Sequence, residues 1–190
     1  MSAVETTGAA PTGRRRTLLF VIPVLVFAVV GVFLALGLTR DPSLLPSALV
    51  GKPAPDFDLP PIPGRDEAGF RRADLGGKPM LVNVFSSWCL PCRAEHPLVS
   101  KLAEEGVTVM GINYKDDPAA ATAWLKELGD PFTKVGADRN GRTAIEWGVY
   151  GVPETFVIDK NGQIVHRQAG PLMPRDVEQT IKPLLARLSQ

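Results

Sequence analysis

Residues 80–97 read MLVNVFSSWCLPCRAEHP and combine two predicted elements around a pair of cysteines. The run at 80–85 is short and mostly apolar, which is typical of a buried strand. Apolar residues at helical spacing then predict a helix over residues 90–105, with a glycine directly after it. Cys89 and Cys92 therefore lie where a strand is followed by the N-terminus of a helix.

This position of the cysteines predicts reactive sulfur chemistry. Unpaired backbone N–H groups and the helix dipole favour a thiolate at a helix N-terminus, and the thiolate is the nucleophile of disulfide exchange. Cys92 follows one turn later, close enough to form a disulfide with Cys89, and Pro91 suits the first turn. We predict that Cys89 attacks and that Cys92 resolves the product; a permanent disulfide or a buried inert pair is the alternative.

The composition argues against several other kinds of site. The formal net charge is +1 and the basic residues form no long stripe, so nucleic-acid binding is not expected. Two cysteines are too few for a disulfide-stapled scaffold. Zinc is disfavoured because no second cysteine pair accompanies His96 and because His166 is predicted on a strand surface. Haem attachment would need histidine in place of Arg93. We therefore expect no metal, and no cofactor besides a redox-active disulfide.

Outside the cysteine segment, the sequence predicts alternating strands and helices. A loop or short hairpin is expected over the Pro- and Gly-rich residues 59–79, and a Lys-Asn-Gly turn at 160–162 predicts a hairpin. The remaining predictions are strands at 107–113, 155–159 and 163–168, and helices at 119–128, 139–147 and 175–188. This order predicts an α/β sandwich with a mixed central sheet.

The N-terminal region differs from the rest of the chain. Residues 17–38 carry no charge, and as a helix they would be about 33 Å long, enough to cross a hydrocarbon core of about 30 Å. Three arginines precede this run, so the positive-inside rule places the residues after position 40 outside the cytoplasm. A cleaved signal peptide is the alternative. The predicted organisation is a cytoplasmic tail (1–16), a transmembrane anchor (17–39), a linker (40–50) and one globular domain (51–190).

Four segments together resemble one family. They are LVNVFSSWCLPCRAEHP at 81–97, GINYKDD at 111–117, WLKELGDPF at 124–132 and GVYGVPETFVIDKNG at 148–162. The chain resembles the thioredoxin superfamily and, within it, the CcmG/DsbE thiol:disulfide interchange proteins of cytochrome c biogenesis. The resemblance implies a thioredoxin fold held in the bacterial inner membrane by a single-pass anchor, with the C-terminal domain in the periplasm.

The same resemblance implies a function and partners. Its members act as reductants that keep the CxxCH thiols of apocytochrome c reduced for haem attachment, directly or through a maturation thiol protein. A membrane thiol transporter of the DsbD or CcdA type would be the electron donor. The resemblance assigns no role to residues 114–117, which serve only as a subfamily marker.

The resemblance also nominates site residues. Pro153 matches the cis-proline that faces the cysteines in this fold and presents the backbone of Val152 to a substrate peptide. Asn83 stands where thioredoxins carry a buried acid, so the proton acceptor for Cys92 must lie elsewhere. Glu95 and Glu154 are the candidates, because acids at both places lie near the active site in this family. The alternative for Glu95 is a carboxylate on the solvated face of a helix.

Two aromatic residues and the electrostatics complete the hypothesis. Trp88 and Tyr150 are candidates to frame a substrate groove, with packing in the core as the alternative. Carboxylates near the cysteines would disfavour the thiolate and make the protein a reductant, since the oxidant DsbA depends on a stabilised reduced form.

Three other functions are alternatives to this hypothesis. They are a general oxidoreductase or oxidant of the TlpA or DsbA type, a non-catalytic docking module, and a peroxiredoxin. The chain lacks the Thr-x-x-Cys motif of a peroxiredoxin.

Overall fold

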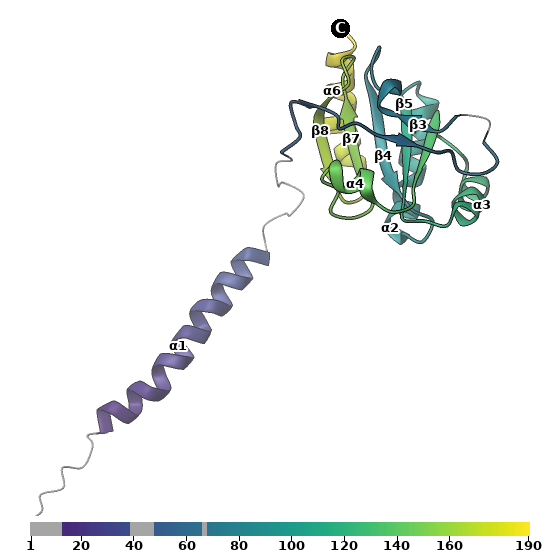
Figure 1. Cartoon of the computed structure of the whole chain (residues 1–190). Coiled ribbons are helices and arrows are strands. Elements are labelled where there is room, and N and C mark those ends of the chain that lie inside the picture. The colour runs from purple at the N-terminus through teal and green to yellow at the C-terminus, as the bar shows by residue number, and fades with distance from the viewer. Residues whose placement is uncertain (1–12, 39–47, 66–67) are drawn as a thin grey trace, which may run out of the picture. The chain divides into compact units, whose positions relative to one another are not determined.

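The computed structural model describes residues 13–38, 48–65 and 68–190, and the chain divides into two compact units, Met1–Pro42 and Ser43–Gln190 (Figure 1). In the first unit, helix α1 spans Gly13–Leu38. Within it, Leu19–Gly37 has a mean hydropathy of 3.0 and is long and apolar enough to cross a bilayer. Most of the predicted tail and linker, residues 1–12 and 39–47, lies outside the described residues, so the predicted domain limits remain predictions.

The second unit is built on a six-stranded mixed sheet, as the predicted fold class requires. In spatial order its strands are β1 (Lys52–Pro53), β8 (Gln163–Ala169), β7 (Glu154–Ile158), β4 (Met80–Phe85), β5 (Thr108–Tyr114) and β6 (Lys134–Asp138). β4 pairs in parallel with β5 and antiparallel with β7, so it is central and buried on both faces. This burial explains its mostly apolar sequence.

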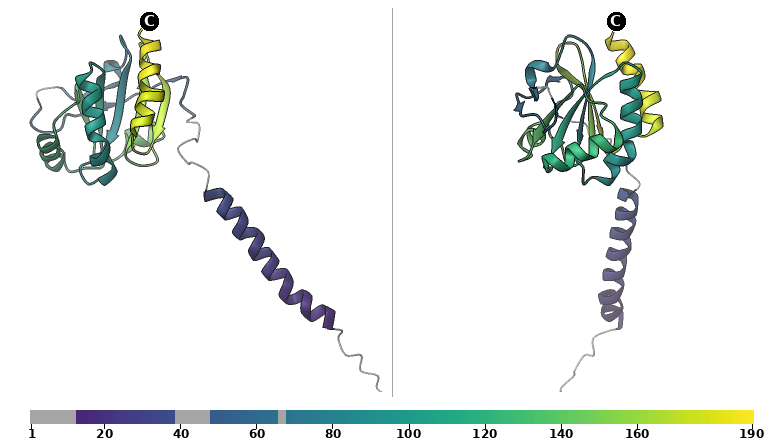
Figure 2. Two further views of the ribbon diagram at one scale, coloured as in Figure 1. Left: turned by 180° about the vertical axis from the view of Figure 1, so that it is seen from behind. Right: turned by 90° about the vertical axis from the view of Figure 1, so that its right-hand side faces the viewer.

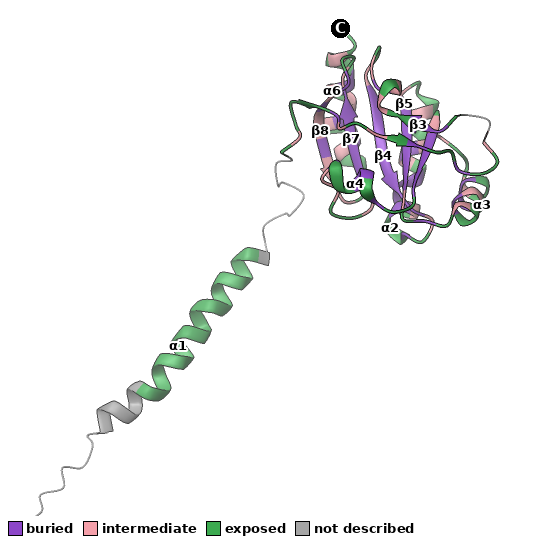
Figure 3. Cartoon of the chain, viewed as in Figure 1, coloured by how far each residue is buried: buried purple, intermediate pink, exposed green. Residues whose placement is uncertain are grey.

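Helices cover one face of this sheet, and a hairpin with a short helix covers the other (Figures 1 and 2). The first face packs against α2 (Leu90–Glu104), α3 (Pro118–Leu128) and the C-terminal segments α5 (Pro174–Asp176), η3 (Val177–Ile181) and α6 (Lys182–Leu188). The second packs against α4 (Arg142–Glu146), the hairpin β2 (Asp58–Leu59) and β3 (Phe70–Arg71), and the adjoining 3₁₀ turn η2 (Arg72–Asp74). The buried strands lie between these layers (Figure 3).

The structure corrects several predicted elements. β1 and β6 were not predicted, and the helix predicted over 139–147 is confined to Arg142–Glu146. The C-terminal helix exists but contains a π-helical stretch at Val177–Ile181. Pro183 follows that stretch and has no N–H to donate, which accounts for a local departure from α-helical bonding.

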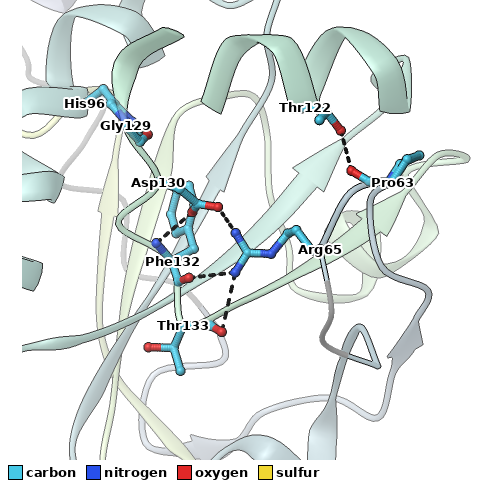
Figure 4. A network of polar contacts seen from close by, with 8 residues as sticks. All are labelled: Pro63, Arg65, His96, Thr122, Gly129, Asp130, Phe132 and Thr133. Carbon is cyan, nitrogen blue, oxygen red and sulfur yellow. Dashed lines mark hydrogen bonds and ion pairs between the residues drawn. The ribbon is translucent and has the colours of Figure 1, made fainter. Parts of the chain in front are cut away.

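A polar network ties the loop between β2 and β3 to the segment that leads into β6 (Figure 4). Arg65 pairs with Asp130 and donates from Nη2 to the carbonyl of Phe132 at 2.8 Å. At the same segment His96 from α2 contacts the Gly129 carbonyl through Nε2 at 2.9 Å. Burial lowers the pKa of His96, and its ring packs edge-on against Trp124. His96 thus helps to pack α2 against the segment that leads into β6 and against α3.

Candidate active site

Cys89 occupies the N-cap of α2, four residues after the end of β4. Its sulfur is bonded to that of Cys92, with 5.3 Å between the two Cα atoms. The backbone N–H of Cys92 also points at the Cys89 sulfur, 3.1 Å away, and the same donor would stabilise a Cys89 thiolate after reduction. Cys89 is 4% exposed and Cys92 is 1% exposed, so Cys89 is the less buried of the two residues. The geometry is that expected for an attacking and a resolving cysteine.

Glu95 lies on the inner side of α2, three residues after Cys92, and is only 2% exposed. Its Oε1 accepts a hydrogen bond from Nδ2 of Asn83 at 2.8 Å, and its Oε2 accepts one from the backbone N–H of Leu172 at 2.6 Å. Burial raises the pKa of Glu95 to about 7, although both hydrogen bonds act in the opposite direction. The alternative of a solvated helix carboxylate is therefore wrong.

Asn83 on β4 holds the buried carboxyl group of Glu95 through its side-chain amide. Its Nδ2 group donates to Glu95 and also to Oγ1 of Thr155, at 2.8 and 3.0 Å. Asn83 and Thr155 are paired across β4 and β7, so the two strands hold the amide in place. The carboxyl group comes from α2 instead of from the strand.

We expect the raised pKa of Glu95 to be measurable as a pH dependence of stability. Below pH 4.5 the carboxyl is protonated in both the folded and the unfolded chain. Between 4.5 and about 7 the unfolded chain releases this proton while the folded chain retains it, so the free energy of unfolding falls as the pH rises. At about 1.4 kcal/mol per pKa unit the total loss is about 3 kcal/mol.

The measurement is urea unfolding from pH 4 to 8 for the wild type and for Glu95→Gln. Other groups titrate in both proteins, so the difference between the two curves isolates Glu95. Glu95→Gln should gain relative stability as the pH rises to 7. Two curves that stay parallel over this range would show that the folded-state pKa of Glu95 is not raised.

Glu154, the second acid, has a different environment. Both of its carboxylate oxygens pair with Arg167, at 2.6 Å from Nε and 2.8 Å from Nη2, and the side chains are 2% and 4% exposed. Oε1 also accepts the backbone N–H of Tyr150 at 2.8 Å. The bidentate pair balances the charge of Glu154 and links β7 to β8, and the Tyr150 N–H links the loop before β7 to the same carboxylate. Glu95, by contrast, accepts hydrogen bonds from two neutral donors.

The loop before β7 has the backbone that the resemblance implies. The Val152–Pro153 peptide is cis, as predicted, and Val152 is half-buried beside it. Tyr150 is 80% exposed, and its ring lies 4.5 Å from the guanidinium carbon of Arg167. Trp88 is 60% exposed, and its Nε1 donates to the carbonyl of Lys115 at 3.1 Å. Packing in the core is therefore excluded for both aromatic side chains.

Four residues with a place in the site were not among the predicted site residues. Leu90 is 76% exposed and lies between the cysteines, where the sequence marks it only as uncharged. Leu172 and Arg167 hold the two acids, and Asp116 binds the loop that leads to Cys89. The sequence signal for Asp116 was the marker segment 114–117, whereas Leu172 acts through its backbone and carries no signal.

Metal ligands are not gathered in the described part of the chain, which holds no group of three or more His, Cys, Asp or Glu side chains arranged for an ion. The predicted lack of a metal or separate cofactor stays a prediction. The chemistry that the described residues offer is that of the Cys89–Cys92 disulfide.

Comparison with known proteins agrees with this chemistry. A family model described as Redoxin matches residues 49–182. The thiol:disulfide interchange protein DsbE of Pseudomonas aeruginosa is 48% identical over 90% of this chain and 94% of its own length, and DsbE of Escherichia coli K12 is 45% identical over 93% and 97%. A solved structure described as a DsbE-type interchange protein from Chlorobium tepidum superposes with a TM-score of 0.60 at 30% identity, covering 72% of this chain and 95% of that one.

Proposed function

Because this chain belongs to the DsbE family of thiol:disulfide interchange proteins, we propose that it works as a reductant of cysteine pairs in cytochrome c maturation. The substrate is a disulfide in the CxxCH segment of apocytochrome c, or in a maturation thiol protein that serves it. A membrane thiol transporter of the DsbD or CcdA type returns the electrons. The apolar helix α1 anchors the chain in the inner membrane and leaves the catalytic domain in the periplasm.

The reaction transfers two electrons from the cysteine pair to the substrate. The Cys89 thiolate attacks one sulfur of the substrate disulfide, forming a mixed disulfide and releasing one substrate thiolate, which takes up a proton. Cys92 then gives up its proton, and its sulfur attacks the sulfur of Cys89. This second step releases the other substrate sulfur as a thiolate, which takes up a proton, and leaves the Cys89–Cys92 disulfide, the form present in the structure.

Glu95 is the acceptor for the Cys92 proton in this proposal. Residues three apart on a helix are neighbours, with about 5–6 Å between their Cβ atoms, and Cys92 and Glu95 both lie on the buried side of α2. A pKa of about 7 lets the carboxyl accept and release a proton near neutral pH. Glu154, held by Arg167, positions the cis-proline loop instead.

The observation that carries the direction of electron flow is the buried Glu95 carboxyl, which is bonded to neutral donors only in the described contacts. A carboxylate at this place disfavours a thiolate in the cysteine pair. The residues between the cysteines, Leu90 and Pro91, supply no cation to offset it. A reduced form whose thiolate is disfavoured by a nearby carboxylate gives up electrons readily. The reduced form of DsbA, by contrast, is stabilised, which makes DsbA an oxidant.

A redox titration of the full chain against glutathione tests the direction. We expect a reduction potential well below the roughly −120 mV of DsbA, at about −180 mV or lower. Glu95→Gln should raise the potential, on the order of 30 mV for a tenfold change in the equilibrium constant. Glu127→Gln is the matched control, because Glu127 is an exposed carboxylate paired with Arg93. A potential near −120 mV would instead identify an oxidant.

A further inference from the structure

The last residue of β5 and the segment after it contact each of the three residues that lead from β4 to Cys89. The Ser86 hydroxyl donates to the carbonyl of Tyr114. Ser87 donates to the Asp116 carboxylate twice, from its backbone N–H at 2.6 Å and from its hydroxyl at 2.7 Å. The Trp88 indole N–H donates to the Lys115 carbonyl at 3.1 Å. Each residue of the loop that leads to Cys89 is thus hydrogen-bonded to the end of β5 or to the segment that follows it.

The Asp116 carboxylate is the centre of these contacts. It is buried, and besides Ser87 it accepts from Nδ2 of Asn113 at 2.8 Å and from the backbone N–H of Asp117 at 2.9 Å. A carboxylate offers about four lone-pair sites, so four donors use its full capacity. Each of these hydrogen bonds has an ionised acceptor and is stronger than a neutral one.

The segment itself is supported from the next strand. β4, β5 and β6 are parallel, and their registers bring Phe85, Asn113 and Ala137 to the same edge of the sheet. The Lys115 backbone N–H donates to the Asp138 carbonyl at 2.9 Å. Lys115 has a φ of +43°, an uncommon value for a residue other than glycine, which the surrounding contacts must stabilise. A strained backbone held in this way at a site is typical of a functional position.

From these contacts we infer that Asp116 is a positioning residue for disulfide exchange. It fixes Ser87, and with it the loop whose Trp88 side chain stands in solvent next to Cys89. Trp88 is thereby presented as a rigid apolar contact for the chain on either side of a substrate disulfide. Asp116 does not touch the reacting sulfurs, so it acts on the binding of peptide disulfides and not on the chemistry of exchange. The inference rests on exchange at Cys89 and not on the direction or the substrate given under the proposed function.

The variant that tests this inference is Asp116→Asn, which places an amide NH₂ against groups that are themselves donors. Asp117→Asn is the matched control. Asp117 is adjacent in the sequence, but its carboxylate accepts from Ala120 N–H at 2.9 Å and caps α3. Both substitutions remove one charge from the same segment, and only the first reaches Ser87.

Single-turnover kinetics of the reduced full chain provide the first readout. The substrates are a cyclic CxxCH peptide disulfide and, for comparison, hydroxyethyl disulfide, which has no peptide to bind. For Asp116→Asn we expect the half-saturating peptide concentration to rise roughly five- to tenfold, because order in the loop must be restored on binding. The maximal rate with peptide and the rate with hydroxyethyl disulfide should change less than about twofold. Asp117→Asn should match the wild type in all of these values.

The second readout is the indole N–H resonance of Trp88, identified by its loss in Trp88→Phe among the three tryptophans of the chain. It should shift in Asp116→Asn and stay in place in Asp117→Asn. This signal does not depend on any substrate, so it tests the inference even if the peptide is not reduced and the proposed function fails. Unchanged peptide affinity together with an unchanged resonance would overturn the inference, whatever the effect on stability.

A milder variant covers the case in which Asp116→Asn does not fold. Ser87→Ala removes only the hydroxyl that Asp116 binds and keeps the backbone hydrogen bond. It should produce the same two changes at smaller size. If Ser87→Ala folds and alters neither peptide affinity nor the Trp88 resonance, the inference is wrong.

Discussion

Replacing Cys89 with serine is expected to abolish disulfide exchange by this protein. Cys89 is the less buried of the two cysteines, and its sulfur accepts the Cys92 N–H at the start of α2. A serine hydroxyl cannot form a mixed disulfide, and Cys92 is the more buried residue and lies inside α2 instead of at its N-cap. The rate at which a peptide disulfide is reduced should therefore fall to the uncatalysed background, which a thiol-release assay with the full chain measures directly.

The same substitution separates catalysis from docking. A non-catalytic docking module would keep its cellular function in Cys89→Ser, because the fold and its exposed aromatic side chains remain. An interchange protein would lose that function. Glu127→Gln serves as the control, since it changes an exposed side chain of α3 and leaves both sulfurs in place.

Replacing Arg167 with alanine is expected to cause the largest loss of stability. The guanidinium forms two hydrogen bonds with Glu154, and both side chains are almost fully buried. Removing one partner of a buried ion pair leaves the other charge without compensation, which costs about 3–5 kcal/mol. Urea unfolding of the full chain, followed by tryptophan fluorescence, should show this loss. Tyr150 should also lose its ordered position, because its ring packs against the Arg167 guanidinium and its backbone N–H donates to the Glu154 carboxylate that Arg167 holds.

Two comparisons make the Arg167 result specific. Arg93→Ala breaks the exposed pair with Glu127 and should leave the free energy of unfolding nearly unchanged. The double variant Arg167→Met with Glu154→Gln removes both charges and should recover a large part of the loss, because the cost lies in the unpaired carboxylate. Arg167→Ala with stability equal to that of Arg93→Ala would contradict the role given to this ion pair.

The centre of the fold and the cysteine pair could be predicted from the sequence because their signals are local. β4 is a mostly apolar run, and the strand-to-helix change falls within a few residues of Cys89. The hairpin between β7 and β8 was predicted from its Lys-Asn-Gly turn. Each of these elements is specified by neighbours in the sequence, so no long-range contact has to be known.

The unpredicted features depend on contacts between distant segments. β6 reads KVGAD, which is too short and too weakly apolar to indicate a strand, and its glycine is required where Leu59 and Phe70 of the hairpin lie against it. The pairing of Arg167 with Glu154 depends on an irregularity in register between β7 and β8 that no turn motif specifies. Glu95 has the spacing of an ordinary helix carboxylate, and only the packing of Leu172 and Asn83 around it shows that it is buried.

The most direct test of the central claim is to trap the mixed disulfide with Cys92→Ser. In the full chain this variant can attack but cannot resolve, so a partner should stay attached, and peptide mass spectrometry should find it bonded to Cys89 through a CxxCH segment. Cys89→Ser should capture nothing. A partner bonded at Cys92 in Cys89→Ser, or no covalent partner on Cys89 in Cys92→Ser, would contradict the assignment of Cys89 as the attacking thiol.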